Sequence, residues 1–241
     1  MNVVVLTRNP RGIASRFVAR GNVPVARIVL DEGPGPDVRS RLRKLRRVGP
    51  TAVPVGLALR RVYADAQGSQ PHVDELGLDV VRVPTLNGAD ARAALAEADV
   101  AVSLDNRLIS EATFSVPQHG VVNVHHGAVP AYRGGPPVFW ELADGLEAVG
   151  FTVHRIDAGV DTGPVLATGE VPILRRRTLA DTLAATIPAL HEASLDALER
   201  VLHSHSLDGT KQEPSGGFRT TPRLRDYLRV RRALRNYDRR L

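Results

Sequence analysis

The sequence contains no cysteine, and this absence excludes several kinds of chemistry at once. Without a thiol there is no disulfide framework, no thiolate zinc site and no cysteine nucleophile. Any catalysis must therefore come from other side chains. The core must also hold without covalent cross-links, and a hydrophobic content of 43% in 241 residues is sufficient for that.

Long hydrophobic runs are also absent. The first apolar run covers only residues 3–6, which is shorter than the apolar region of a secretory signal. No later run approaches the length of a membrane span. The sequence therefore predicts a soluble, cytoplasmic protein without a membrane partner.

Lysine is scarce, because Lys44 and Lys211 are the only two, and arginine supplies nearly all of the positive charge behind a net charge of +6. Much of this arginine lies in two blocks, residues 39–47 and 223–240. Few aromatic residues interleave with the blocks, which disfavours base stacking on nucleic acid. We interpret both blocks as solvated helix faces and do not expect nucleic acid as a partner. A protein that binds RNA through these blocks is the alternative from a different functional class.

Short apolar segments alternate with helical ones along the chain. Strands are expected at residues 2–6, 25–30, 78–83, 99–104, 121–125, 150–156 and 165–171. Helices are expected at residues 10–20, 37–48, 56–67, 88–98, 136–145 and 178–205. This order predicts an α/β protein with a Rossmann-like, mostly parallel sheet flanked by helices, in which one of the last two strands runs antiparallel. We expect one main domain over residues 1–206 and an arginine-rich, helical C-terminal extension over residues 207–241.

Polar side chains interrupt the strand at residues 121–125. Asn123 and His125 are two positions apart, so they face the same side of the strand. Ligands of open α/β sheets bind at the carboxyl ends of the strands, where these two residues lie. His126 must face away from His125, and adjacent histidines on opposite faces make a poor chelating pair. We therefore expect no metal site here.

A second polar motif, "DAGVDTGP", covers residues 157–164 between two strands. Its glycines and proline allow a tight loop that carries two carboxylates toward the sheet edge, where Asp161 can reach His125. An Asn–His–Asp set suits acyl transfer to an amine, because an amide and a protonated imidazole stabilise a developing oxyanion. A carboxylate orients the imidazole and accepts a proton. The candidate catalytic residues are therefore Asn123, His125 and Asp161.

The segment "NVHHGAVPAYRGG" followed by "GFTVHRIDAGVDTGPVL" resembles the formyltransferase superfamily that uses 10-formyltetrahydrofolate. The family pattern is Asn-x-His, a proline-containing loop that ends in Arg-Gly, and then Asp-x-Gly-x-Asp-x-Gly. Asn123, His125 and Asp161 fall on the family's catalytic triad. The resemblance covers residues 99–172 and is weaker over the first strand.

The resemblance implies a formyl donor, 10-formyltetrahydrofolate, and no metal. The donor's pterin is expected against the loop after the fourth strand and under the aspartate loop, at Asn106, Arg107, Leu108, Ile109, Asp157 and Val160. The acceptor amine is expected beside the Arg-Gly loop, at Tyr132, Arg133 and Gly134. Arg133 is the residue expected to meet a diphosphate on the acceptor.

Differences from the family's branches narrow the expected function. The residues after the first strand read "TRNPRGIA" rather than a glycine- and serine-rich phosphate loop, which disfavours purine biosynthesis. The residues after 171 are too few and too helical for the β-barrel of methionyl-tRNA formyltransferases, and no regulatory domain of the formyltetrahydrofolate hydrolase kind precedes the first strand. The family's usual serine after the histidine is Gly127. The expected function is therefore N-formylation of a small-molecule amine, such as a nucleotide-linked amino sugar or a natural-product intermediate.

Other functions stay open at this point. They are hydrolysis of the formyl donor by water, a tRNA-directed formyltransferase-like activity, and a catalytically silent scaffold. Of the remaining histidines, His154 is interpreted as a packed strand residue, and His203 and His205 as solvated. Pairing through the long helix after Thr178 and the tail would give a homodimer.

Overall fold

The computed structural model describes residues 1–34, 52–68, 70–213 and 216–238, and it confirms the predicted α/β fold. Within these residues, one sheet has the strand order β3-β2-β1-β4-β5-β7-β8. Its strands are β1 (Val3–Thr7), β2 (Val25–Asp31), β3 (Asp79–Val83), β4 (Val100–Leu104), β5 (Val121–His125), β7 (Ala148–Arg155) and β8 (Val165–Pro172). A separate parallel pair joins β6 (Arg133–Gly134) to β9 (Phe218–Arg219).

The sheet is mostly parallel, as predicted. The first five strands pair in parallel, whereas β7 pairs antiparallel with both β5 and β8. Because β8 is antiparallel to β7, it runs in the same direction as β5. The expectation that one of the last two strands runs against the sheet is therefore confirmed, and that strand is β7.

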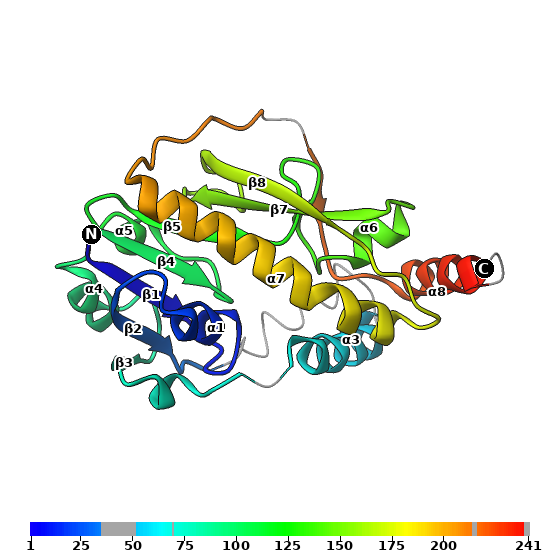
Figure 1. Cartoon of the computed structure of the whole chain (residues 1–241), viewed down its shortest axis with the longest axis horizontal. Helices are drawn as coiled ribbons and strands as arrows, with labels where there is room; N and C mark the ends of the chain where they lie inside the picture. The colour runs from blue at the N-terminus through cyan, green and yellow to red at the C-terminus, as the bar shows by residue number, and fades with distance from the viewer. Residues whose placement is uncertain (35–51, 69, 214–215, 239–241) are drawn as a thin grey trace.

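Helices cover both faces of the sheet (Figure 1). They are α1 (Ile13–Arg20), α3 (Ala52–Gln67), α4 (Ala89–Leu95), α5 (Glu111–Phe114), α6 (Phe139–Ala143), α7 (Leu179–Ser204) and α8 (Leu224–Asp238), with a 3-10 turn, η1 (Val73–Leu76). The helix expected at residues 37–48 lies outside the described residues. The helix expected to begin at Pro10 begins at Ile13, with Gly12 in the N-cap position. None of the described helices is long and apolar enough to cross a membrane.

Strand β1 shows why the sheet needs helices on both faces. All five of its side chains are buried, as expected of a central parallel strand. Val3 and Val5 pack into the core cluster that includes buried residues of α1 and α7. Val4 and Leu6 point the other way, into the cluster that includes α4. The period of two along the strand thus divides one apolar run between two cores.

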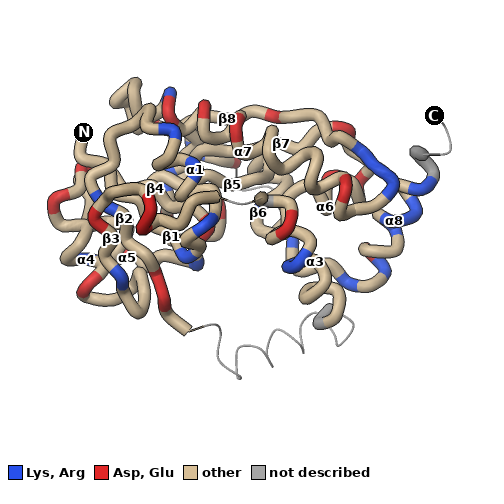
Figure 2. The backbone as a smooth tube through the Cα atoms, turned by 60° about the horizontal axis from the view of Figure 1, so that its bottom comes forward, with Lys and Arg blue, Asp and Glu red and all other residues tan. Residues whose placement is uncertain are grey.

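Helix α7 crosses the sheet and carries part of the cavity described below. Thr178 caps it by accepting a hydrogen bond from the Asp181 N–H, and the helix continues unbroken through Pro188. Helix α8 contacts α3, α6 and α7 and buries Val230 and Leu234 completely. Its described arginines are exposed, which fits a solvated face for the described part of the second arginine block. Figure 2 marks the arginine positions along α8 in blue. The first block lies outside the described residues.

Candidate active site

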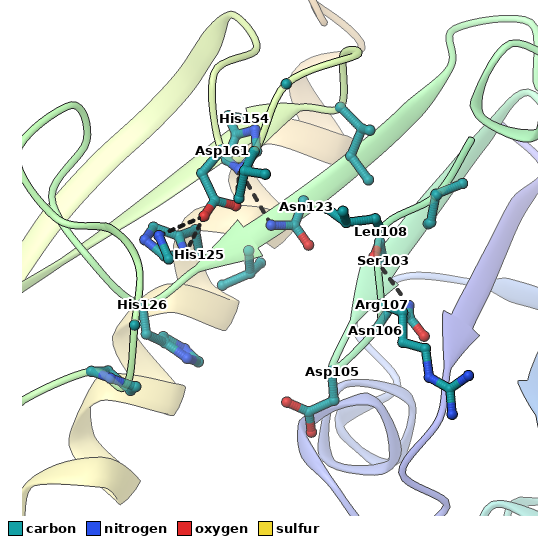
Figure 3. A pocket seen from close by; sticks show the side chains of 18 of the residues that line it. Ser103, Asp105, Asn106, Arg107, Leu108, Asn123, His125, His126, His154 and Asp161 are labelled. Carbon is teal, nitrogen blue, oxygen red and sulfur yellow. Dashed lines mark hydrogen bonds and ion pairs between the residues drawn. The ribbon is translucent and has the colours of Figure 1, made fainter. Parts of the chain in front are cut away.

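A cavity of about 590 Å³ opens at the carboxyl ends of β4 and β5. Its walls come from the loop after β4, the end of β5, the loop between β7 and β8, and the helices α3 and α7 (Figure 3). All three candidate catalytic residues, Asn123, His125 and Asp161, line this cavity. The position agrees with the rule that open α/β sheets bind ligands at the carboxyl ends of their strands.

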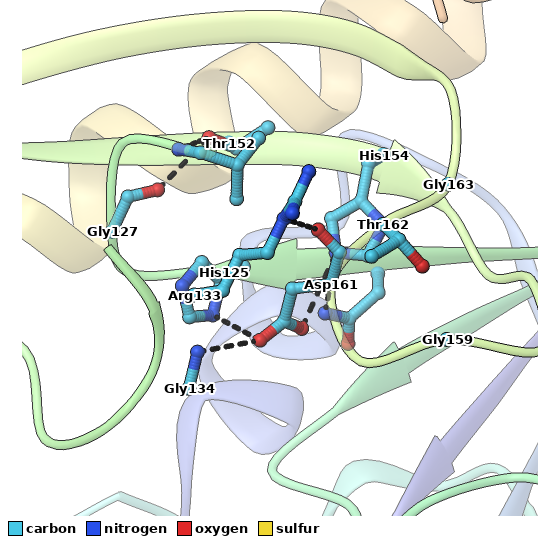
Figure 4. A network of polar contacts seen from close by, with 12 residues as sticks. His125, Gly127, Arg133, Gly134, Thr152, His154, Gly159, Asp161, Thr162 and Gly163 are labelled. Atoms are coloured by element: carbon cyan, nitrogen blue, oxygen red, sulfur yellow. Dashed lines mark hydrogen bonds and ion pairs between the residues drawn. The ribbon is translucent and has the colours of Figure 1, made fainter. Parts of the chain in front are cut away.

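The three side chains meet through short contacts. His125 Nδ1 lies 3.4 Å from Asp161 Oδ2. Asn123 reaches the aspartate through a fourth residue, because its Nδ2 lies 3.2 Å from His154 Nε2, which in turn lies 3.6 Å from Asp161 Oδ1 (Figures 3 and 4). Residues distant in the sequence thus form one polar cluster. Their catalytic roles stay a prediction.

Strand pairing explains why His154 joins the cluster. In the antiparallel register of β5 and β7, Asn123 is opposite His154 and His125 is opposite Thr152. Opposite residues of paired strands project on the same side, so each pair forms a neighbouring couple. His154 Nδ1 lies 2.8 Å from the Arg155 carbonyl oxygen and must carry the hydrogen, because a carbonyl only accepts. In the neutral ring Nε2 therefore accepts from the Asn123 amide, which fixes the orientation of that amide.

Asp161 is held in place by its own loop and by the Arg-Gly segment. The residue adopts a left-handed backbone conformation with φ of 52°. The Gly134 N–H donates to Asp161 Oδ2 at 2.9 Å. Asp157 braces the same loop, because its Oδ1 accepts from the Gly159 N–H and the Thr162 hydroxyl at 3.0 and 2.6 Å. Two backbone N–H groups and one hydroxyl, donating to the carboxylates of Asp161 and Asp157, therefore fix the loop that aims Asp161 at His125; Figure 4 shows the contacts of Asp161.

The pKa values of the facing pair favour a carboxylate next to a largely neutral imidazole. Burial acts to raise the pKa of Asp161, but the His154 and His125 rings and the Gly134 N–H outweigh it and leave the pKa below its usual range. Burial lowers the pKa of His125, and Asp161 and the Tyr132 carbonyl offset this only in part. His125 Nε2 lies 2.6 Å from the Tyr132 oxygen and carries the hydrogen. In the neutral ring Nδ1 is therefore bare and faces a carboxylate, ready to share an incoming proton.

All the residues expected to contact the formyl donor line the cavity. They are Asn106, Arg107, Leu108, Ile109, Asp157 and Val160. Asn106 Nδ2 donates to the Leu6 carbonyl and to Ser103 Oγ, and Arg107 Nη2 donates to the carbonyls of Gly33 and Pro34. These polar side chains therefore hold the loop. Leu108, 68% exposed, presents apolar surface at the cavity.

The structure places the expected acceptor residues differently. Gly134 lines the cavity, but Arg133 and Tyr132 do not. The Arg133 guanidinium is buried and donates to the Asp161 carbonyl, to Gln212 Oε1 and to the Glu213 carbonyl. Arg133 thus anchors the aspartate loop to the segment after α7, in place of the expected contact with a diphosphate. The Tyr132 hydroxyl donates to Asp144, and only its carbonyl contacts the site.

Sequence reasoning missed several cavity residues. His154, interpreted as a packed residue, is buried but contacts Asn123 and Asp161 directly. His126, expected to face away from His125, lines the same cavity beside His191 of α7. His154 could be found from its position opposite Asn123, but that position is known only once the register of β5 and β7 is known. Nothing in the local sequence indicates that α7 contributes His191.

Gly127 occupies a position with no room for a side chain. A Cβ at this residue would collide with the Tyr132 carbonyl oxygen and lie 2.6 Å from His125 Nε2. A larger residue here would require the Tyr132 backbone or the His125 ring to shift. In the described part of the chain, no group of three or more histidine, aspartate or glutamate side chains is arranged to hold a metal ion.

Comparison with known proteins shows what this chain resembles. Residues 85–199, which include the whole polar cluster, match the family described as formyl transferase. Over this segment the chain is similar to the formyltransferase superfamily. It is 39% identical over 117 residues to the methionyl-tRNA formyltransferase of Ruegeria pomeroyi, covering 46% of this chain and 39% of that protein. It is 31% identical over 160 residues to that of Anaeromyxobacter dehalogenans, covering 66% and 50%. The chain thus spans about half or less of these relatives.

Solved structures share the fold over most of the chain. A sugar N-formyltransferase from a Shewanella species superposes with a TM-score of 0.59 at 15% identity, covering 97% of this chain and 87% of that one. The Helicobacter canadensis N-formyltransferase in complex with folinic acid and dTDP-3-aminofucose gives 0.58 at 14%, covering 100% and 82%. A phosphoribosylglycinamide formyltransferase from Streptococcus pneumoniae gives 0.55 at 19%, covering 84% and 97%.

Proposed function

We propose that this protein transfers a formyl group from 10-formyltetrahydrofolate to the primary amine of a small molecule, with a nucleotide-linked amino sugar as the acceptor class. The observation that carries the proposal is the meeting of Asn123, His125 and Asp161 in one cavity, within the segment that matches the family. The cavity has room for a ligand and offers both hydrogen-bond donors and a carboxylate where a carbonyl group would react.

In the proposed reaction, the amine nitrogen attacks the formyl carbon and the carbonyl oxygen gains negative charge. One N–H of Asn123 is directed at His154, which leaves the second for this oxygen. The attacking nitrogen loses a proton to the His125–Asp161 pair, directly or through water, because Nδ1 and Oδ2 face each other there. The bond from carbon to N10 then breaks, N10 takes up a proton, and tetrahydrofolate and the N-formyl amine are the products.

The donor is assigned to the side of the cavity formed by the loop after β4. Leu108 and Ile109 present apolar side chains there, and the Asp157–Asp161 loop lies opposite. A flat pterin ring suits such a wall, because its faces are apolar and its edges form hydrogen bonds with backbone groups. The Helicobacter enzyme of the same fold, whose structure holds folinic acid, supports a folate as the donor.

Two acceptor classes have support from different observations. Sugar N-formyltransferases match the fold over nearly the whole chain, which favours a nucleotide-linked amino sugar. The curated relatives are methionyl-tRNA formyltransferases, which makes an aminoacyl-tRNA the second candidate, although the chain covers only part of their length. Hydrolysis uses the same polar cluster, with water in the place of the amine.

One assay separates these functions. The purified full chain is mixed with 10-formyltetrahydrofolate and, in turn, with a panel of nucleotide-linked amino sugars, with methionyl-tRNA, or with buffer alone. We expect tetrahydrofolate and N-formyl sugar to appear in equal amounts, and only when an amino sugar is present. Formate released at full rate in buffer alone would establish the hydrolase, and formyl-methionyl-tRNA the second acceptor. No loss of formyl donor in any mixture would contradict the proposal.

A further inference from the structure

His191 of α7 is a buried side chain without a polar partner at the wall of the cavity. It is 6% exposed and lines the cavity, and its ring forms no hydrogen bond with the residues that the structure describes. Neither ring nitrogen is among the buried atoms that lack a partner, so the polar atoms of the ring stay accessible. A ligand in the cavity can therefore form a hydrogen bond with the ring.

The neighbours of His191 support the ring but do not satisfy it. His126 stacks on it with ring centroids 5.0 Å apart. Ser194 donates its hydroxyl hydrogen to the His191 carbonyl at 3.0 Å, so its oxygen accepts from His126 Nε2 at 3.1 Å. Ser194 therefore fixes the position and tautomer of His126. The polar atoms of the His191 ring are left for a ligand.

His191 lies at the end of the cavity opposite the assigned donor loop. Figure 3 shows Asn123 and His125 between His126, which stacks on His191, and the loop that carries Arg107 and Leu108. Ile187 and Leu190 of the same helix line the cavity as well, as do Tyr63 and Pro137. With the donor on one side of the reacting carbonyl, the acceptor must approach from this other side.

The charge at the His191 end of the cavity limits which chemical groups of the acceptor can bind there. Burial and the nearby Arg16 lower the pKa of His191 to about 4, and burial with the neighbouring histidines holds the pKa of His126 well below its usual range. Both rings are therefore neutral near pH 7. Among the described residues that line the cavity, Arg107 is the only lysine or arginine, and it belongs to the donor loop. Among these described lining residues, a phosphate or carboxylate finds no cationic partner at this end, whereas a hydroxyl can both donate to and accept from a neutral imidazole.

We infer that His191, held by the stacked His126, is a specificity-determining residue that binds a hydroxyl group next to the reacting amine of the acceptor. The apolar side chains around it then cover the carbon ring that carries this hydroxyl. The inference rests on the proposed function and narrows the acceptor to an amine on a hydroxylated ring whose charged groups, if present, lie outside this end of the cavity.

The test compares His191→Leu with the unchanged protein on paired acceptors. Each nucleotide-linked amino sugar of the panel is paired with its analogue that lacks the hydroxyl on the carbon next to the amine. For the hydroxylated acceptor, we expect His191→Leu to raise KM about tenfold or more, with little change in the KM of the formyl donor. For the deoxy analogue, the KM values of the variant and of the unchanged protein should differ by less than about twofold. This analogue already lacks the hydroxyl that would bond to His191, so the substitution removes no further bond.

Two further variants separate recognition from folding. His191→Gln keeps a neutral donor and acceptor and is expected to recover most of the affinity for the hydroxylated sugar. His203→Leu changes an exposed histidine of the same helix, outside the cavity, and is expected to leave every KM unchanged. Equal effects of His191→Leu on both members of each pair, or no effect on either, would overturn the inference.

A binding measurement keeps the inference separate from the proposed function. With nitrogen-15 labelled histidine and no formyl donor, the ring signals of His191 are followed by NMR while the hydroxylated sugars are added. A shift that the deoxy analogues do not produce supports the subsite even if no sugar is formylated, in which case only the proposed function fails. Absence of such a shift with every sugar overturns the subsite even if formyl transfer is observed.

Discussion

Replacing His125 by alanine is expected to lower kcat for formyl transfer about a thousandfold, with little change in the KM of the folate donor. The reason lies in the contacts of the ring. Nδ1 faces the Asp161 carboxylate at 3.4 Å, and Nε2 donates to the Tyr132 carbonyl at 2.6 Å. Without the imidazole, the proton released by the attacking amine has no acceptor that is both near and stabilised by a carboxylate. Steady-state kinetics with the acceptor found in the transfer assay measure the effect.

A matched control variant shows whether substitution of a histidine by itself impairs folding and activity. His119→Ala removes an exposed imidazole that does not line the cavity and is expected to keep full activity. Asp161→Asn should lose activity comparably to His125→Ala, and the double variant should lose little more than either single one, because the two residues act as a unit. Unchanged turnover in His125→Ala would refute the assigned chemistry, and strictly additive losses would refute the pairing with Asp161.

The second large effect concerns stability, and it is expected at Glu141 of α6. This side chain is 2% exposed, and its Oε2 has no hydrogen-bond partner among the described residues. Burial raises its pKa from 4.5 to about 7. The folded state therefore binds more protons than the unfolded state between these two values, so the contribution of Glu141 falls as pH rises through this window. Across it the loss amounts to about 3 kcal/mol of the free energy of unfolding.

Glu141→Gln removes this titration and keeps the shape of the side chain. We expect the variant to exceed the unchanged protein in stability by about 3 kcal/mol at pH 8, and the difference to shrink toward pH 5. His126 and His191 have lowered pKa values and act in the opposite sense, adding stability as pH rises, but they are common to both proteins and cancel in the difference. Urea denaturation at several pH values gives the comparison.

The control for this prediction is Glu147→Gln, which changes an exposed carboxylate just beyond the same helix. It is expected to leave the pH dependence of stability unaltered. If Glu141→Gln and the unchanged protein showed parallel stability curves from pH 5 to pH 8, the carboxyl group would not be neutral in the folded state at low pH, and the account of its burial would be wrong.

Much of the fold follows from the sequence because its signals are local. Strand β5 spans residues 121–125 as predicted, since an apolar β-branched run followed by glycine and proline has few other structures available. The presence of Asn123, His125 and Asp161 in one cavity also follows from the period of a strand and from the rule for carboxyl ends. Both inferences need only neighbours in the chain and a general topology.

The features that sequence reasoning missed depend on contacts between distant segments. His154 joins the polar cluster because β5 and β7 pair in one particular register, and His191 because α7 crosses the sheet above β5. Arg133 was expected in contact with an acceptor diphosphate, but the segment after α7 supplies Gln212 and Glu213 as closer partners. An arginine in a loop motif does not reveal whether its guanidinium faces a ligand or the protein.

The most direct test of the account is the position of a formyl group bound in the cavity. A crystal structure with a hydrolysis-stable 10-formyl folate analogue should place the pterin against Arg107, Leu108 and Ile109. The formyl oxygen should lie within hydrogen-bond distance of Asn123 Nδ2, about 2.7–3.2 Å, with the His125–Asp161 pair beside the formyl carbon. An analogue bound outside this cavity, or bound in it with the formyl group turned away from Asn123 and His125, would contradict the central claim.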